Sequence, residues 1–218
     1  MSPGVVARGL RRAELISDRP ARSAQFCRDL LGWHTEPSVG GIDCWVGARC
    51  CARILAGRSG QPCGWRPVLA GASHHGTLNG PDGTEAALAA GRAQHGPRAP
   101  APRAGEPCWI DLFTSDDVRA DRFWAGTLGW DVVAHPGAEY LADGRPISSR
   151  TAQRCPGAER GWLCYFAVDD VPAAADHAGG LGADTATREH PVLGSTTLVT
   201  GPEGGTFGVA ALPGGWGG

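Results

Sequence analysis

The strongest constraint on this chain is an internal repeat whose two copies lie 97 residues apart. Residues 13–33, AELISDRPARSAQFCRDLLGW, align without a gap on residues 110–130, IDLFTSDDVRADRFWAGTLGW. Phe26 falls on Phe123, and Trp33 falls on Trp130. Each copy predicts a strand, a helix with a polar start and an exit at Leu-Gly-Trp. A repeat of this length indicates that the chain is assembled from copies of one supersecondary unit.

The second copy is followed by a further unit of the same type. A strand is predicted at residues 163–168, and the sequence Asp-Asp-Val-Pro then favours the start of a helix. Residues 196–200 and 206–211 read as paired strands around a glycine-rich turn. Residues 107–157 and 161–212 therefore predict two related β-α-β-β-β modules.

The matching module of the first half, near residues 64–105, is predicted to be shortened or rearranged. A strand at residues 65–70 is not followed directly by a helix-forming sequence. The strong helix former of this region is TEAALAAGRAQH at residues 84–95, which predicts a helix. The Pro- and Ala-rich sequence PRAPAPRAG follows and is expected to be an extended, exposed linker.

These patterns predict an α+β chain with two domains. The first domain is expected at residues 8–96 and is degenerate because its second module is shortened. The linker is expected at residues 97–106, and the second, intact domain at residues 107–213. A chain of 218 residues is long enough for two small domains that each bury a core.

Composition and charge exclude several classes of protein. Hydrophobic residues make up 42% of the chain, which is typical of globular and not of disordered proteins. The net charge of −2 provides no basic surface for nucleic acid or for an anionic membrane. No apolar run is long enough to span a bilayer, and no secretory signal pattern opens the chain, so a cytoplasmic protein is expected. The eight cysteines include no C-x-x-C pair and are expected to be reduced and mostly buried.

Three motifs carry a family resemblance: PCWIDLFTSD…FWAGTLGW, WLCYFAVDDVPAAADHAGGLGA and GPEGGTFGVA. With the repeat, they resemble the vicinal oxygen chelate superfamily, which includes glyoxalase I, bleomycin-resistance proteins and extradiol dioxygenases. The chain is most similar to the tandem, two-domain actinobacterial branch. The resemblance implies tandem β-α-β-β-β modules whose mixed sheets curl into cups around a small molecule.

The resemblance also implies positions for metal ligands. In metal-dependent members, His or Glu begins each module's first strand, and Glu lies on each last strand. The matching positions here hold Arg12, Trp109, Leu163 and Gly208, none of which coordinates a metal through its side chain. We therefore expect neither a metal site nor a cofactor.

Strand alternation predicts which side chains share a cup, because residues i and i+2 lie on the same face of a strand. Trp109, Asp111 and Phe113 are expected inside the second cup, with Leu163 and Tyr165 from the neighbouring strand. The small residue Gly208 is expected to leave room at the floor. In the first cup, Arg12 and Glu14 take the corresponding places. The second cup is thus predicted to bind a planar or aromatic ligand.

Asp111 is the first candidate for a catalytic residue, and Glu14, which aligns with it in the repeat, is the second. Desolvation among aromatic side chains favours the neutral acid, which would suit a general acid or base. The alternative is a structural role, in which each acid pairs with an arginine or with backbone N–H groups. His135 and His190 lie near predicted strand ends and are expected to line the rim of the cup.

Three functions remain open from the sequence. The favoured one is a metal-independent enzyme, such as a natural-product tailoring enzyme, that acts on a hydrophobic or aromatic small molecule by acid–base catalysis. The alternative is a protein of the bleomycin-resistance type that sequesters such a compound without turnover. The third is a metal-dependent lyase or dioxygenase. The expected partner is a small hydrophobic or aromatic ligand, a homodimer is compatible with the sequence, and the substrate is not readable.

Overall fold

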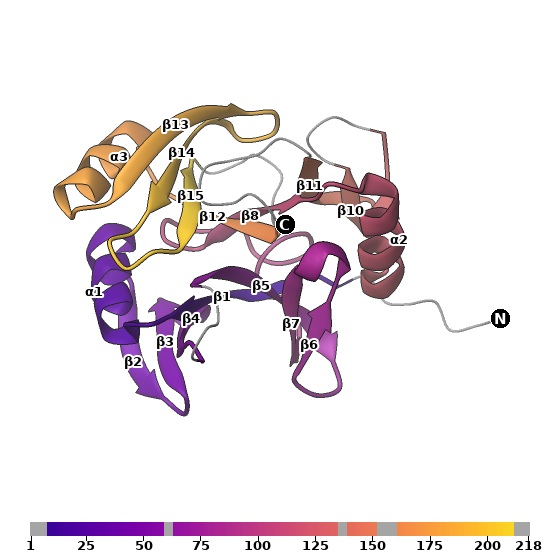
Figure 1. Ribbon diagram of the computed structural model, residues 1–218, viewed down its shortest axis with the longest axis horizontal. Helices are drawn as coiled ribbons and strands as arrows, with labels where there is room; N and C mark the ends of the chain where they lie inside the picture. Colours follow the sequence, from indigo (N-terminus) through magenta and orange to yellow (C-terminus); the bar gives the residue numbers. More distant parts are fainter. Residues whose placement is uncertain (1–7, 59–62, 135–138, 152–160, 212–218) are drawn as a thin grey trace.

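The computed structural model describes residues 8–58, 63–134, 139–151 and 161–211. These residues form two mixed β-sheets and three α-helices. In Figure 1 the sheets lie one above the other, with α1 and α3 close together at one end and α2 at the other. The predicted α+β class, with one sheet for each half of the chain, is confirmed.

The first sheet has seven strands in the order β2-β3-β4-β1-β5-β7-β6. Its central strand β1 is parallel to β4 and antiparallel to β5. In chain order its elements are β1 Leu10–Ser17, α1 Pro20–Leu31, β2 His34–Ser38, β3 Gly41–Val46, β4 Arg49–Ala56, β5 Gly64–Ala72, β6 Gly76–Asn79, the 3-10 helix η1 Pro81–Gly83 and β7 Glu85–Ala90.

The second sheet has eight strands in the order β13-β14-β15-β12-β8-β11-β10-β9. Its central strand β8 is parallel to β11 and antiparallel to β12, which repeats the arrangement around β1. In chain order its elements are β8 Pro107–Phe113, α2 Asp117–Leu128, β9 Asp131–Val132, β10 Tyr140–Ala142, β11 Arg145–Thr151, β12 Gly161–Ala167, α3 Val171–Gly180, β13 Asp184–His190, β14 Gly194–Thr200 and β15 Thr206–Ala210.

The helices confirm the repeat residue by residue. Helix α2 begins and ends 97 residues after α1. Both helices end at a glycine in the left-handed region, Gly32 at φ 69° and Gly129 at φ 67°, where a Cβ atom would be strained. Asp116 caps α2 by accepting from the backbone N–H of Arg119. The Leu-Gly-Trp exit is therefore a helix C-cap followed by a buried tryptophan.

One prediction for the degenerate module of the first half is wrong. Residues 84–95 were expected to be helical, but residues 85–90 form the strand β7. This strand lies between β5 and β6, with Val68 opposite Ala87 and Leu78 opposite Ala86. Helix propensity favours alanine by only a fraction of a kcal/mol per residue, and pairing with two strands outweighs it. Among the described residues, this module lacks an α-helix and one strand.

The segment at residues 97–106 is bound to the protein. We had expected an exposed linker, and that prediction is wrong. Arg49 donates to the carbonyls of Pro100 and Ala101. The carboxylate of Glu106 is fully buried and forms ion pairs with Arg49 at 2.5 Å and Arg103 at 2.7 Å. Arg49 of β4 therefore anchors the segment to the first sheet, and Arg103 of the segment donates to the Val46 carbonyl of β3. The division of the chain into domains at this segment stays a prediction.

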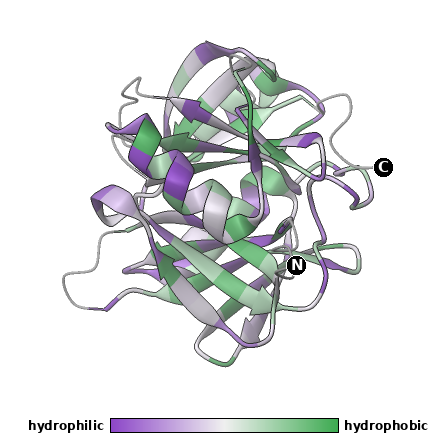
Figure 2. Cartoon of the chain, turned by 90° about the vertical axis from the view of Figure 1, so that its right-hand side faces the viewer, coloured by the Kyte–Doolittle hydropathy of each residue, from purple (hydrophilic) through white to green (hydrophobic). Residues whose placement is uncertain are grey.

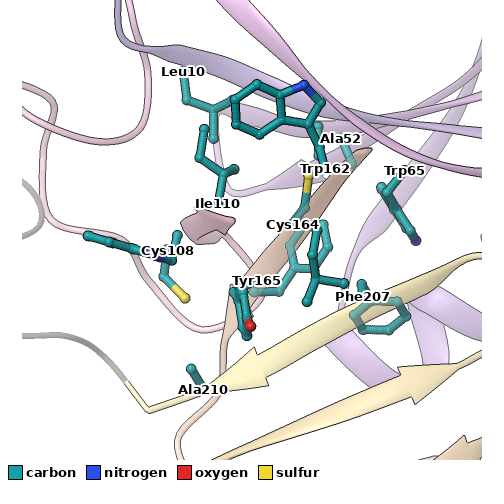
Figure 3. Close-up of a cluster of buried hydrophobic side chains, with 14 of the residues drawn as sticks. Leu10, Ala52, Trp65, Cys108, Ile110, Trp162, Cys164, Tyr165, Phe207 and Ala210 are labelled. Carbon is teal, nitrogen blue, oxygen red and sulfur yellow. The ribbon is translucent and has the colours of Figure 1, made fainter. Parts of the chain in front are cut away.

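One hydrophobic core extends across both sheets. Figure 3 shows Trp65 of the first sheet beside Phe207 of the second. Phe166 packs edge-on against Trp65 at 5.2 Å and against Trp33 at 5.3 Å between ring centroids. Figure 2, turned by 90°, shows hydrophobic residues on strands of both halves. Each sheet thus uses one face to cover the other half of the chain.

The cysteines in the described part of the chain are free, and most are buried, as expected. Burial raises the pKa of the Cys27, Cys108 and Cys164 thiols well above the ordinary value. Such thiols remain protonated and behave as small hydrophobic groups. None of the described helices is long and apolar enough to cross a membrane.

Candidate functional site

The candidate site lies on one face of the second sheet, which we call the Asp111 face. Strand alternation along β8 puts Trp109, Asp111 and Phe113 on this face and Ile110 on the opposite face, and all of them are buried. Pairing across the sheet brings Tyr165 opposite Trp109. The predicted grouping of these side chains follows from strand alternation and register.

Both carboxylate oxygens of Asp111 are fully hydrogen-bonded. Oδ1 accepts from Trp109 Nε1 at 3.1 Å and contacts His190 Nε2 at 3.1 Å. Oδ2 accepts from the Tyr165 hydroxyl at 2.7 Å and from Arg188 Nη2 at 3.0 Å. We call these five residues the Asp111 cluster. Asp111 itself is only 1% exposed, so these contacts replace its hydration shell.

His190 is held in one tautomer. Its Nδ1 atom accepts from the backbone N–H groups of Val192 and Leu193, both at 3.0 Å. The remaining proton is therefore on Nε2, which donates it to Asp111. The ring is 4% exposed and packs edge-on against Tyr165. The structure thus places His190 inside the cluster, deeper than the rim position that we had predicted.

Arg188 links the cluster to the surface. Its Nη2 atom donates both to Asp111 and to the Tyr165 hydroxyl. Its guanidinium lies 5.9 Å from the ring centroid of Phe113 and 5.8 Å from that of Tyr165, within the range of a cation–π contact. A quarter of the Arg188 side chain is exposed, whereas the Asp111 side chain is almost completely buried. A ligand that arrives from solvent would therefore contact Arg188 before Asp111.

Sequence reasoning missed Arg188. The signal was its spacing of two residues from His190, which places both side chains on the same face of a strand. This face of β13 contacts Asp111 only because of the strand order β13-β14-β15-β12-β8. A single sequence does not contain this order.

Gly208 is required by Tyr165. The two residues lie opposite each other in the parallel pair β12–β15. A Cβ atom at position 208 would lie 2.1 Å from Cδ1 of the tyrosine ring, which is far inside van der Waals contact. The room that we expected at the floor of the cup is therefore filled by Tyr165. Leu163 is fully buried and lies opposite Asp111. His135 lies outside the described residues.

In the first half, Glu14 is paired with two arginines. Oε1 accepts from Arg12 Nη2 at 2.7 Å, and Oε2 accepts from Arg66 Nη2 at 3.0 Å. Glu14 is 5% exposed, and Arg66 also reaches Glu85 at 3.3 Å. Glu14 and Arg12 are thus partners of each other, and this geometry supports the structural role for Glu14. The two cups do not contain equivalent sites.

The residues present do not fit a metal ion of the kind that the fold implies. In the described ranges, no three His, Cys, Asp or Glu side chains gather in a way that could hold one. In the second cup, the available acid and imidazole are Asp111 and His190, and they bond to each other. The guanidinium of Arg188 also lies on the carboxylate, where a second cation would be repelled. Trp109, Leu163 and Gly208 supply no ligand atoms.

Residues 108–210 match the family model of the glyoxalase-like domain. Two relatives whose printed name describes CFP32 as a glyoxylase, from Mycobacterium bovis and Mycobacterium tuberculosis, are each 30% identical to the chain over 120 residues. That alignment covers 49% of this chain and 46% of each relative, so the chain spans about half the length of these curated relatives.

Three solved structures share the fold at low sequence identity. The Mn(II)-bound glyoxalase of Novosphingobium aromaticivorans has a TM-score of 0.65 and 12% identity, covering 94% of this chain and 82% of its own. The E323L mutant of homoprotocatechuate 2,3-dioxygenase from Brevibacterium fuscum has a TM-score of 0.64 and 14% identity, covering 99% and 75%. The 2,3-dioxygenase LapB of Pseudomonas sp. KL28 has a TM-score of 0.58 and 14% identity, covering 97% and 93%.

Proposed function

We propose that this chain, which has the fold of the vicinal oxygen chelate superfamily and a glyoxalase-like domain at residues 108–210, is an enzyme that acts on a hydrophobic or aromatic small molecule without a metal ion. The observation that supports the proposal is the Asp111 cluster. It joins an acid, a phenol, an imidazole and a guanidinium on the face of the sheet where the fold would place a ligand.

The cluster favours proton transfer through Tyr165. The Tyr165 hydroxyl donates to Asp111 at 2.7 Å and accepts from Arg188. When the phenol oxygen takes a proton from a substrate carbon, its own proton can pass to Asp111, and the bonding electrons stay on the substrate as an enolate. The positive charge of Arg188 would stabilise that enolate. Tyr165 then gives a proton to a different carbon of the substrate and takes its own proton back from Asp111. This completes an isomerisation and restores the enzyme, so protons and electrons balance.

The surroundings of the cluster support an apolar and planar substrate. Trp109, Phe113 and Leu163 are each at most 1% exposed and line the same face as Asp111. Aromatic walls with a few convergent polar groups are the usual composition of a small-molecule site. In the proposed enzyme, Asp111 receives the Tyr165 proton and holds Tyr165 and Arg188, while His190 is a positioning residue that holds Asp111. Arg188 and Tyr165 would contact the substrate.

A second candidate is sequestration of a similar compound without turnover. It is favoured by one specific observation, namely that both Asp111 oxygens already accept from two donors each. A carboxylate whose oxygens are all hydrogen-bonded can serve only to hold together the strands that carry its donors. Under this alternative, the Asp111 cluster shapes a binding wall and exchanges no protons.

The two candidates differ in what Tyr165→Phe does. If Tyr165 exchanges the proton, this variant should retain ligand affinity while kcat falls by about a hundredfold or more. The matched control is Tyr140 of β10, whose hydroxyl donates to Asp121 of α2 at 2.8 Å. Tyr140→Phe removes the same kind of bond and should leave kcat nearly unchanged.

The measurement is a screen of hydrophobic and aromatic carbonyl compounds, with binding followed by calorimetry and conversion followed by mass and NMR. Binding with an unchanged ligand, in wild type and both variants, would support sequestration and contradict the enzyme. Turnover that requires a stoichiometric divalent metal would contradict both metal-free candidates.

A further inference from the structure

A pocket lies at one end of the first sheet, and its residues take no part in the Asp111 cluster. It has a volume of about 180 Å³ and lies where β1 begins, β5 ends and the chain leaves β7. Arg8 and Arg92 line it, together with small residues: Gly9, Ala70, Gly71, Gly91 and Ala93. Apart from the two arginines, the pocket is therefore lined by glycine and alanine.

Two glycines shape this pocket. Gly71 has φ 77° and Gly91 has φ 94°, both in the left-handed region, and the Gly71 N–H donates to the Gly91 carbonyl at 2.8 Å. A Cβ atom at Gly71 would lie 3.4 Å from Arg8 Nη1, and one at Gly91 would lie 3.8 Å from Arg11 Cζ. Without side chains at these positions, two guanidinium groups approach the main chain closely and the pocket stays open.

The arginines here differ from most others in the part of the chain that the structure describes. Arg8 Nη1 donates to the carbonyl of Ala70 at 3.0 Å, and Arg11 Nη1 donates to that of Arg92 at 3.3 Å. Within the described ranges, none of Arg8, Arg11 and Arg92 forms an ion pair. By contrast, arginines packed on either sheet are paired with acids, as in Arg12 and Arg66 with Glu14, Arg49 and Arg103 with Glu106, Arg150 with Asp121, and Arg188 with Asp111.

We propose that this arginine pocket, which is lined by Arg8, Arg92, Gly71 and Gly91 and flanked by Arg11, binds a phosphate group. Three positive charges held together without an acid repel one another, and an anion with two charges relieves that repulsion. Guanidinium groups match the geometry of phosphate oxygens and can bond them in pairs. The volume admits a phosphate with a small organic substituent. The net charge of the whole chain is −2, so this positive cluster is not part of a generally basic protein.

The experiment is a titration of the full chain with sodium phosphate at constant ionic strength, followed by calorimetry and by the shift in melting temperature. Saturable binding is expected, with sodium chloride at the same ionic strength as the reference. Arg92→Gln and Arg8→Gln should each weaken binding about tenfold or more, because each removes a charged hydrogen-bond donor. Arg92 is exposed, so its removal should not change stability without phosphate.

The matched control is Arg119→Gln, since Arg119 is an exposed arginine of α2 that lies outside this pocket. It should bind phosphate as wild type does. Binding that does not saturate, that equals the chloride reference, or that falls equally in Arg119→Gln would overturn the proposal. Binding of phenyl phosphate distinguishes an organic phosphate from the free phosphate ion as the natural ligand. Binding tighter than that of inorganic phosphate indicates an organic phosphate, and weaker binding indicates the free ion.

Discussion

Asp111 shows how tertiary contacts decide the chemistry of a single residue. A carboxylate enclosed by Trp109 and Tyr165 rings alone would lose its hydration and favour the neutral acid. Here the indole N–H, the phenol, His190 and Arg188 supply four hydrogen bonds, and the arginine adds a compensating charge. Both carboxylate oxygens are occupied by these donors, so Asp111 is better suited to holding Tyr165 and Arg188 than to acting alone.

His95 is a second residue whose surroundings oppose its usual charge. It is 1% exposed, and burial together with the nearby Arg49 lowers its pKa from 6.5 to about 3. The unfolded chain binds a proton at this position below pH 6.5, while the folded chain does not until about pH 3. The contribution of His95 to stability is therefore complete above pH 6.5 and is lost as the pH falls from 6.5 towards 3.

We predict that His95→Leu flattens the acid limb of the stability curve. Relative to the variant, wild type should lose about 1.4 kcal/mol per pH unit below pH 6.5. Urea denaturation at several pH values measures this difference, and comparing the two chains cancels the titration of the carboxylates. Curves that stay parallel from pH 7 to pH 4 would show that His95 does not titrate in this way.

At the scale of elements, the pair β12–β15 depends on a glycine. We predict that Gly208→Ala destabilises the protein by about 1–3 kcal/mol, because the added methyl group overlaps the Tyr165 ring. The ring must move, which also breaks its hydrogen bond to Asp111. Chemical denaturation measures the loss, and near-UV circular dichroism reports the displaced tyrosine.

Gly126 is the matched control for this substitution. It lies inside α2, and a Cβ atom there would meet nothing within 4 Å. Gly126→Ala should therefore stabilise the protein by about 0.5–1 kcal/mol through helix propensity. If Gly208→Ala also stabilised the protein, the close approach of β15 to Tyr165 would not exist in solution.

At the scale of the whole molecule, the shared core predicts that the two sheets unfold together. Trp65 is 7% exposed and packs against Phe166 and Phe207 of the second sheet. Trp65→Ala should cost about 3–5 kcal/mol and lower the hydrogen-exchange protection of both sheets. Trp45 on β3 is partly exposed, and Trp45→Ala should cost less. Two separate transitions, with only the first sheet weakened, would contradict a common core.

The sequence alone determined the modules and their local elements. The repeat placed α1 and α2 with the same 97-residue offset that the structure has, and period-two alternation put Trp109, Asp111 and Phe113 on one face. These features depend on residues within a few positions of one another, so a single chain contains the signal. Asp111 was identified for the same reason.

Only the tertiary structure decided what Asp111 and Glu14 contact. Arg188 and His190 lie 77 and 79 residues from Asp111, and Arg66 lies 52 residues from Glu14. The strand β7 likewise forms because β5 and β6 flank it, against its helix propensity. Register and strand order bring such residues together, and both depend on packing across the whole chain, which local sequence patterns do not specify.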